Sequence, residues 1–454
     1  MKINQLISAT VLMVSALSLG SCSDSDEPEL PGAKTETTET TMTVSGVWKK
    51  GETINLDRHL VIPAGESLTI EEGVNVIVST AGVGINHTPI EITVNGNLYC
   101  RGTKEHPILF SVEQSKRTSA NIFAGLWGGI VATQTCEEML IDNTIIEYTG
   151  GQVIEGSPAA TAEIYTAGDD AYPHITTTNI NGHYVITNSI LRNGWSDGIY
   201  LMGGNAIIAN NIFAANGYSG AEAVNLKAGV TADVYGNVMF SPNTNGLKLS
   251  SSGQSENRGQ AKINAYNNTI INAGWRRDGE KGGCIYAEKN VKANVVNNLM
   301  VNCKFRAMTP NYKNPNMTDG GYDNSSVIDY NMYASGSQKS DIVFPEESNV
   351  SFSWEGYNFK HKSYNPDIDT HSKISTESNK IDPLFVNFDV NGVGLTDYIY
   401  NQSWDFHLRN NSPAQSGAAS SAIIKPYFAD GLTLGGATFT SAELAPYFGA
   451  FSTK

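Results

Sequence analysis

The amino-acid sequence predicts an all-β, single-domain parallel β-helix, a solenoid in which one coil stacks on the next. Three observations predict it: a repeated asparagine-led motif, short alternating strands between the repeats, and almost no helical pattern. The chain has 454 residues, of which 44 are glycine and 17% are charged. Glycine therefore exceeds the usual share of about 7% and charge falls below the usual share of about 25%. Many short turns around a stacked core would explain both.

The first signal is an asparagine followed by apolar residues, which recurs from Asn188 onward at intervals of roughly 20 to 35 residues, within the range that indicates solenoids or propellers. A propeller blade needs four strands, so the short and variable period favours a parallel β-helix with one coil per repeat. Asparagine tolerates the left-handed conformation, and stacked asparagines can form a hydrogen-bonded ladder. The motif occurs at Asn143, Asn188, Asn211, Asn237, Asn268, Asn298 and Asn331.

The second signal is a short strand of alternating character between the asparagine motifs. It is seen in Asp197-Gly-Ile-Tyr-Leu201, Asn245-Gly-Leu-Lys-Leu249 and Gly283-Cys-Ile-Tyr-Ala287. Two-residue alternation between Gly, Asn and Asp turns indicates β structure, whereas no sustained helical stripe is present. Asp197, which precedes a glycine, is predicted to be a turn residue.

Residues 1–21 are predicted to be a signal peptide. Lys2 precedes an apolar stretch from Ile7 to Leu19, which has the length of a signal h-region and is too short to span a membrane. The stretch ends in Leu19-Gly-Ser-Cys22, which resembles the lipobox of bacterial lipoproteins. That resemblance implies diacylation of Cys22, and two acyl chains would anchor the protein stably. Ordinary secretion with cleavage near Ser21 is the alternative.

Residues 22–41 are predicted to be the acylated cysteine and a disordered tether. Ser23 to Thr41 has no aromatic residue and a single large aliphatic one, Leu30, so it cannot bury a core. The acidic residues that follow Cys22 resemble the surface-export signal of Bacteroidota lipoproteins. This resemblance implies a lipid-anchored outer-membrane protein exposed at the cell surface. An ordinary acidic linker is the alternative.

Several segments resemble the right-handed parallel β-helix, or pectate-lyase-like, superfamily of bacterial surface proteins. They include an opening rung at Val61–Gly73, a Trp-Gly-Gly rung at Gly125–Val131 and a closing segment at Phe448–Phe451. The resemblance implies a β-helix over residues 42–451, with N-terminal capping strands and loop insertions at about 150–179 and 308–378. Because this superfamily contains lyases, hydrolases and adhesins, the fold does not give the function.

Charge and cysteine usage limit the partners. The formal net charge of −15 disfavours a nucleic-acid partner, which requires a basic face. No Cys-x-x-Cys motif or His/Cys cluster with zinc spacing is present, so no metal and no cofactor are predicted. Besides Cys22, the cysteines are Cys100, Cys136, Cys284 and Cys303. They allow three pairings, of which Cys284–Cys303 is the first to test, and Cys100 is expected to be a buried thiol.

Alternation places a row of polar and aromatic residues on one outer face. If the apolar residues of four successive coils point inward, the row contains Tyr200, Asn225, Lys227, Lys248 and Tyr286. Aromatic rings can pack on the apolar faces of sugars, while amide and ammonium groups bond hydroxyls or a carboxylate. The row is therefore a candidate polysaccharide-binding site, with an ordinary solvated sheet face as the alternative.

An enzymatic version of this site would perform β-elimination on a uronic acid. Such a reaction needs a base for the C5 proton and a cation that neutralises the carboxylate. Lys227 and Lys248 could fill these roles, with Tyr200 or Tyr286 as the acid. The segment from Asn211 to Leu249 resembles alginate- and chondroitin-lyase β-helices, which implies that Lys227 lies near their catalytic lysine. Where that family has an arginine, this chain has Lys248.

Two further charged features of the sequence are not assigned to the binding site. A glycoside hydrolase would need paired carboxylates, and the sequence shows a single Asp-Asp pair, Asp169-Asp170, without polygalacturonase-like motifs. The charged turn from Arg276 to Lys281 is predicted to be a solvated loop.

The sequence thus predicts a cell-surface lipoprotein that binds polysaccharide or another surface glycan along one face of a β-helix. The alternatives are a polysaccharide lyase and an adhesin or structural protein without a small ligand. The predicted membrane contact is the lipid anchor alone. The discriminator is whether the row lies in a cleft walled by the loops at 150–179 and 308–326: a flat open face would favour an adhesin, and a cleft with a lysine near a tyrosine would favour a lyase.

Overall fold

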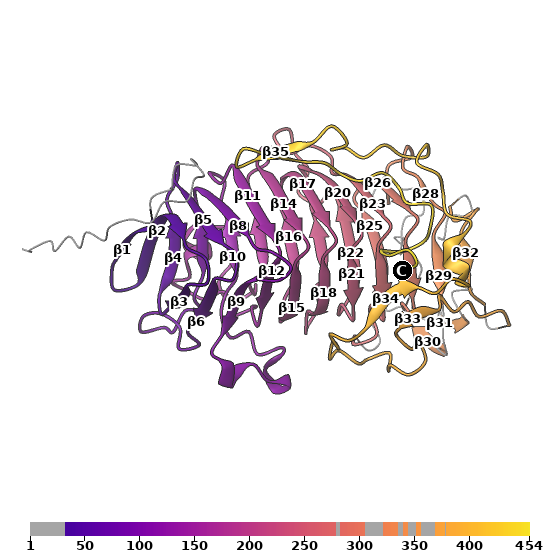
Figure 1. Ribbon diagram of the computed structural model, residues 1–454, viewed down its shortest axis with the longest axis horizontal. Helices are drawn as coiled ribbons and strands as arrows, with labels where there is room; N and C mark the ends of the chain where they lie inside the picture. The colour runs from indigo at the N-terminus through magenta and orange to yellow at the C-terminus, as the bar shows by residue number, and fades with distance from the viewer. Residues whose placement is uncertain are drawn as a thin grey trace, which may run out of the picture. The chain divides into compact units, whose positions relative to one another are not determined.

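Stacked parallel strands form the body of the protein in the computed structural model (Figure 1), which describes residues 32–277, 282–304, 321–334, 339–343, 351–355, 368–376 and 378–454. The predicted signal peptide, Cys22 and most of the predicted tether lie outside the described residues. Each coil contributes up to three strands, and equivalent strands of neighbouring coils pair in parallel. The prediction of an all-β, parallel β-helix solenoid is confirmed, and the long parallel sheets are consistent with the right-handed form.

Three parallel sheets run along the solenoid, named here in chain order within a coil. Sheet 1 contains β4 (His59–Ile62), β7 (Ile92–Val94), β10 (Ile130–Ala132), β13 (Ile175–Thr177), β16 (Ile199–Leu201), β19 (Val224–Leu226), β22 (Asn245–Ser250) and β25 (Gly283–Glu288). Sheet 2 contains β5 (Ser67–Glu71), β8 (Asn97–Arg101), β11 (Glu138–Asp142), β14 (His183–Thr187), β17 (Gly204–Ala209), β20 (Val230–Tyr235), β23 (Lys262–Tyr266), β26 (Lys292–Val296) and β28 (Ile328–Asp329). Sheet 3 contains β3 (Thr53–Leu56), β6 (Asn75–Val78), β9 (Ile108–Val112), β12 (Thr144–Glu147), β15 (Ile190–Gly194), β18 (Ile212–Asn216), β21 (Val238–Phe240), β24 (Thr269–Ile271), β27 (Leu299–Val301), β29 (Met332–Ala334) and β32 (Lys373–Ile374).

The remaining elements cap or decorate the solenoid. β2 (Thr41–Trp48) spans the starts of sheets 1 and 2. The other strands form antiparallel pairs: β30 (Lys339–Val343) with β31 (Ser351–Glu355), β33 (Phe385–Asn387) with β34 (Asp405–Leu408), and β35 (Leu432–Leu434) with β36 (Ala437–Phe439). Helical structure among the described residues is limited to α1 (Pro158–Thr161) and single 3₁₀ turns at Gln114–Lys116, Ser119–Asn121 and Pro413–Gln415.

The folded part begins earlier than the composition of the tether predicts. β1 (Lys34–Thr37) pairs antiparallel with β2, so the predicted disordered tether up to Thr41 is too long. All four side chains of β1 are exposed. The strand is held by backbone hydrogen bonds, which an argument from apolar side chains does not detect.

Asparagines form a ladder through the core turns, as the repeat predicts. The Nδ2 atom of each donates to the Oδ1 atom of the next, at 3.0, 2.9, 2.9 and 3.1 Å. The ladder consists of Asn211, Asn237, Asn268, Asn298 and Asn331. Asn143 and Asn188 lie one position before it, in the left-handed conformation, while the next residues, Thr144 and Ser189, occupy the ladder position. Asparagine suits both positions, so the motif alone does not separate them.

The C-terminal segment covers the outer faces of two of the three sheets. Residues 419–447, called here the strap, run along sheet 2 with β35 over β11 and β14 (Figure 1). Phe428, Leu432 and Leu434 pack on outward residues such as Val185 and Ile207. The backbone nitrogens of Tyr427 and Phe428 donate to the buried Asp233 carboxylate of β20 at 3.1 and 2.9 Å. Around β33 and β34, an aromatic cluster that includes Phe385, Phe388 and Phe406 packs on the outer face of sheet 3.

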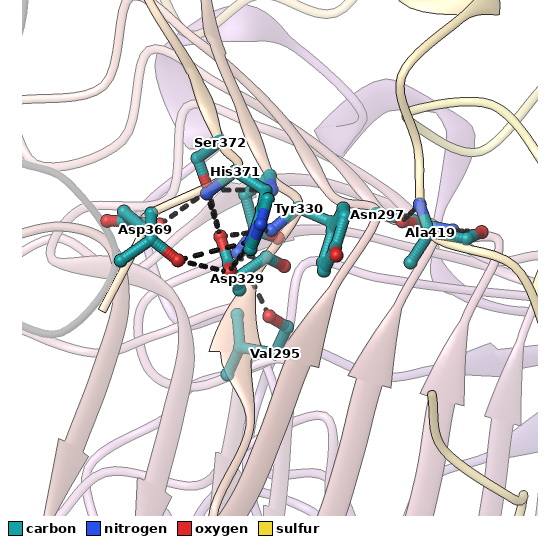
Figure 2. Close-up of polar contacts among 10 residues, drawn as sticks. Val295, Asn297, Asp329, Tyr330, Asp369, His371, Ser372 and Ala419 are labelled. Atoms are coloured by element: carbon teal, nitrogen blue, oxygen red, sulfur yellow. Dashed lines mark hydrogen bonds and ion pairs between the residues drawn. The ribbon is translucent and has the colours of Figure 1, made fainter. Parts of the chain in front are cut away.

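Polar contacts close the last coil and hold the strap (Figure 2). Asp329, at the end of β28, accepts hydrogen bonds from the backbone nitrogens of Tyr330 and His371 at 2.8 and 2.7 Å, and its carboxylate lies 2.6 Å from Nδ1 of His371. Nearby, the Asn297 side chain bonds both the carbonyl and the N–H of Ala419 at 3.0 and 2.7 Å. These contacts replace the coil-to-coil pairing that ends here, so this polar cluster has a structural role.

The described cysteines and helices bear on two further predictions. Cys100, Cys136, Cys284 and Cys303 are buried thiols that form no disulfide in the described residues. None of the helices that the structure describes is long and apolar enough to span a membrane.

Candidate functional site

Sheet 1 keeps an open outer face over the coils from β16 onward. The long excursion that the sequence shows at 150–179 folds back over the earlier coils, where Val153, Ala159 and Tyr172 bury the outward Val131. Its anchor is the buried Glu91 carboxylate, which accepts hydrogen bonds from the Tyr172 hydroxyl and the Ala159 N–H at 2.8 and 2.9 Å. The excursion is therefore folded against the solenoid and ends where the candidate row begins.

The structure places four of the predicted site residues in one straight row. Tyr200 pairs in register with Asn225, Asn225 with Lys248, and Lys248 with Tyr286, on the adjacent strands β16, β19, β22 and β25. Lys227 follows β19 by one residue and lies beside the row. The alternation of inward and outward side chains is as predicted, because the flanking residues Ile199 and Leu201, for example, are fully buried.

Each lysine of the site lies against a tyrosine ring. The Lys227 Nζ atom is 5.4 Å from the centroid of the Tyr200 ring, and the Lys248 Nζ atom is 6.0 Å from that of Tyr286. Lys248 also lies 3.6 Å from the Glu288 carboxylate. Cation–π contacts of this kind favour the charged ammonium and hold the ring and the amine in a fixed relation.

Two adjoining hollows, called here the paired cavities, flank this row. The first has a volume of about 520 Å³ and is lined by Tyr165, Asp170, Trp195, Asp197 and Tyr200, among others. The second has a volume of about 420 Å³ and is lined by Glu222, Asn245, Lys248, Arg277, Tyr286 and Glu288, among others. They share the wall Ser219–Ala221. The face is therefore hollowed rather than flat.

The walls agree in part with the loops that the sequence suggests. Residues 152–173 of the excursion form one wall of the first cavity. Most of the other predicted wall, 308–326, lies outside the described residues. Instead, Ser219–Ala221, Arg277 and Gly282 bound the second cavity on the described part of the chain.

A column of buried acids under the row was not predicted. Asp197 and Glu222 occupy equivalent positions on neighbouring coils, two residues before the paired Ile199 and Val224, and are 7% and 6% exposed. The Glu222 N–H donates to Asp197 Oδ1 at 2.6 Å, so the two acids lie in contact. The prediction that Asp197 is only a turn residue is therefore wrong, because stacking of the coils brings it against a second acid.

Asn225 joins the two acids instead of facing solvent. It is 4% exposed, and its Nδ2 atom lies 3.2 Å from both the Asp197 and the Glu222 carboxyls. Its Oδ1 atom is buried without a hydrogen-bond partner among the described residues. A buried carbonyl without a donor costs stability.

Burial and neighbouring charges shift the pKa values of Asp197, Lys227 and Lys248 in different directions. Burial, followed by the negative charge of Glu222, raises the pKa of Asp197 well above its ordinary value. Burial and then the neighbouring Lys248 ammonium lower the pKa of Lys227. Burial alone would lower the pKa of Lys248, but the carboxylates of Glu222, Glu288 and Asp197 outweigh it, so its pKa is raised. Separation of pKa values among neighbouring groups is a feature of acid–base sites.

The charged turn after Ala273 contains a structural clamp. Arg276 donates to the carbonyls of Gly217 and Ser241 at 2.7 and 2.8 Å, and its guanidinium lies 4.8 Å from the Phe123 ring centroid. Burial lowers its pKa to about 10. The prediction of a solvated loop is wrong for Arg276, whereas residues 278–281 lie outside the described part.

Comparison with known proteins supports the fold. Residues 40–139 match the family described as "Pectate-lyase like beta helix domain". This match covers the first coils and ends before the paired cavities, whose lining residues begin at Gln152. No curated protein and no solved structure matches the chain. At the level of the family, a pectate-lyase-like β-helix supports a polysaccharide-related or a structural role.

Within the described residues, no group of three or more His, Cys, Asp or Glu side chains is arranged to hold a metal ion. The contacts of the acidic column that the structure shows are hydrogen bonds, from the Asn225 amide to both acids and from the Asn245 amide to Glu222.

Proposed function

We propose that the protein binds a polysaccharide along the outer face of sheet 1, at the paired cavities. The observation that carries this proposal is the in-register row from Tyr200 to Tyr286, which lies beside two adjoining hollows on a face that the strap leaves open. A row over three strand spacings of about 4.8 Å extends for roughly 14 Å, which suits several sugar units of an extended chain.

The lining fits a sugar chain chemically. Tyr200 and Tyr286 are half-buried, so each can offer a ring face while its edge remains held by the protein. The hydroxyl-rich rim of a sugar needs both donors and acceptors, which Lys248, Asn245 and the carboxylate of Glu288 supply. Cations and carboxylates alternate in the second cavity, so binding does not require a strongly anionic glycan.

The test is a binding measurement on a panel of neutral and acidic polysaccharides by isothermal titration calorimetry and affinity electrophoresis. We expect one class to bind, with a loss of at least tenfold in affinity in Tyr200→Ala and Tyr286→Ala. Tyr427→Ala is the matched control, because this tyrosine packs on sheet 2. Absence of binding to the whole panel, or equal loss in the control, would contradict the proposal and favour an adhesin or a structural role.

A second candidate is a polysaccharide lyase, which the lowered pKa of Lys227 favours. With its ammonium beside Tyr200, Lys227 could remove the C5 proton of a uronate while Lys248 faces the carboxylate. Incubation with uronate polysaccharides, followed by absorbance of the unsaturated product, tests this activity. Lys227→Met should abolish such a product, and Lys262→Met, an exposed lysine of β23, should not.

For location, we propose a lipid anchor at Cys22 that displays the protein on the outer membrane. The motif before Cys22 and the acidic residues after it support this proposal. Labelling with a fatty-acid analogue should mark the wild-type chain and not Cys22→Ser. Protease treatment of intact cells should then remove the labelled protein's folded part, and protection from the protease would contradict surface display.

A further inference from the structure

We propose that a platform of four aromatic rings, at the corner between sheets 3 and 1, binds uncharged sugar units of the glycan where its chain leaves the first cavity. The platform consists of Trp195, Tyr218, Phe123 and Tyr398. The inference rests on the proposed glycan binding and adds to it a second part of the path and a class of sugar. Trp195 also lines the first cavity, so the platform continues that hollow away from sheet 1.

The four rings come from distant parts of the chain and meet in one unbroken series. Their centroids are 4.6 Å apart between Trp195 and Tyr218, 5.6 Å between Tyr218 and Phe123, and 5.1 Å between Phe123 and Tyr398. The first two rings belong to the turns after β15 and β18, the third to the loop after β9, and the fourth to the connection between β33 and β34. The series is therefore built by the stacked coils together with the C-terminal segment.

Hydrogen bonds and a cation hold the platform in place. The guanidinium carbon of Arg276 lies 4.8 Å from the centroid of the Phe123 ring. The same guanidinium donates to the carbonyl of Gly217, the residue before Tyr218, at 2.7 Å. In addition, the Tyr218 N–H donates to the Trp195 carbonyl of the preceding coil at 2.9 Å. The rings are thus preorganised, which lowers the entropic cost of binding a ligand on them.

The edges of the rings carry polar groups that the fold does not use. The indole N–H of Trp195 and the hydroxyls of Tyr218 and Tyr398 form no hydrogen bond with any residue that the structure describes. Tyr218 is 56% exposed, so both its ring and its hydroxyl are open to a ligand. A sugar uses both at once, because its C–H groups stack on an aromatic face while its hydroxyls bond the polar edge.

The surroundings of the platform favour an uncharged sugar over a uronate and over a protein partner. Among the described residues, Arg276 is the cation that lies against these rings, and its guanidinium is already bonded to backbone carbonyls. A specific protein interface buries about 800 Å² on each partner. Tyr218 and Ile399, the residue after Tyr398, are the large apolar side chains exposed here in the described part of the chain, and they supply a fraction of that area.

The experiment compares variants of the platform with a variant of the row, each in the full chain. The probes are β-glucan, galactan and xylan as neutral glycans, and polygalacturonate and alginate as acidic ones, measured by isothermal titration calorimetry. We expect a neutral probe to bind, and Tyr218→Ala and Tyr398→Ala should each weaken its binding at least fivefold. Tyr218→Phe, which keeps the ring, should weaken binding less than threefold, and Tyr427→Ala on sheet 2 should bind like the wild type.

The length of the ligand supplies a second readout, which a merely structural role of the rings would not change. Oligosaccharides cut from the probe that binds should show a loss in Tyr218→Ala that grows with their length. Short oligosaccharides fill the cavities without reaching the platform, so Tyr218→Ala should bind them like the wild type. An equal loss at every length would overturn the platform as a binding surface.

The remaining outcomes separate this inference from the proposed function. If Tyr286→Ala weakens binding tenfold while both platform alanine variants bind like the wild type, the platform is overturned and binding at the paired cavities stands. Binding of the acidic probes alone would overturn the class of sugar. A changed oligomeric state of Tyr218→Ala in sedimentation, with unchanged glycan binding, would show an interface between copies instead. Absence of binding to every probe would overturn the proposed function itself. Thermal melting shows whether each variant is folded.

Discussion

Two columns of buried polar residues run through the same coils and differ in how fully they are hydrogen-bonded. In the asparagine ladder, every amide before the last, Asn331, donates to the next asparagine and to a backbone carbonyl, as Asn237 and Asn268 show. Under sheet 1, the column of Asp197, Glu222 and Asn245 brings two buried acids into contact, and the adjoining Asn225 keeps an unpaired carbonyl.

The contrast separates a structural column from one suited to chemistry. A polar network in a dry interior does not lower the stability of the fold when every group in it has a hydrogen-bond partner. A buried acid pair destabilises the folded state, and such a cost is usually found where a site needs a proton at neutral pH. The ladder therefore holds the coils, whereas the acidic column marks the coils where binding is proposed.

The largest expected effect comes from breaking the ladder. Asn268→Ala removes the acceptor of the Asn237 backbone N–H and side-chain amide, so buried donors lose their partner. At about 1–3 kcal/mol for each unsatisfied group, unfolding should become easier by about 3 kcal/mol. Asn225→Ala should cost about 1 kcal/mol, since one side of that amide is already unpaired. Urea denaturation measures both, and equal losses would remove the distinction between the columns.

The next effect concerns the strap. On β35, Leu432 and Leu434 are buried against sheet 2 while Thr433 between them is exposed. Leu434→Ala should reduce the free energy of unfolding by about 2 kcal/mol, the low end for a buried leucine at an edge. Thr433→Ala should change it by less than about 0.5 kcal/mol. If the two variants melt alike, the strap does not seal sheet 2, and the claim that sheet 1 alone is open loses its support.

A smaller change in stability, of opposite sign, is expected when Asp197 is replaced. Because its pKa is raised in the folded state, the folded protein binds the proton more tightly than the unfolded chain does. This contribution is fully present below about pH 4, the ordinary carboxyl value, and is lost as the pH rises through the raised pKa. The charged and titratable groups that face Asp197 are Glu222, Asp170, Tyr165, Tyr200, Lys227 and Lys248.

Asp197→Asn should therefore melt at a higher temperature than the wild type at neutral pH, with the difference vanishing near pH 4. A variant that is more stable than the wild type is what replacement of a destabilising group at a binding site produces. Thermal melts at several pH values check this prediction. A variant that is less stable than the wild type at neutral pH would show that Asp197 is a structural acid like those of an ordinary ion pair.

The repeat in the sequence predicts most of the fold because each coil has the same alternation of inward and outward residues. Alternation at Ile199, Tyr200 and Leu201 gives the correct faces, and the register then aligns Tyr200 with Tyr286. The acidic pair was not predicted because its two residues contact each other across coils. Asp197 and Glu222 are 25 residues apart and come into contact only when the coils stack. A signal did exist, since both stand two positions before the inward residue of a sheet 1 strand.

Other features depend on contacts over still longer separations. The position of Asp170 in the lining of the first cavity depends on the fold of the excursion, and Arg276 finds its carbonyl partners on coils 35 to 60 residues earlier. The strap meets sheet 2 at separations of more than 120 residues, as in the contacts of Asn297 with Ala419 and of Tyr266 with Ala442. No periodicity encodes such contacts, so the repeat predicts the coils and their faces but not what covers them.

The smallest effect is expected at the cysteines, which are buried in the interior. Burial raises the pKa of Cys136 to about 12, and burial followed by the contact with Cys303 raises that of Cys284. Since the thiolate is the reactive form, native protein carrying Cys22→Ser should react with a thiol reagent far more slowly than unfolded protein. After denaturation, mass spectrometry should find four alkylated cysteines. Two fewer alkylations would instead reveal a disulfide, with Cys284 and Cys303 as the pair to map first, and would change which coils are held together covalently.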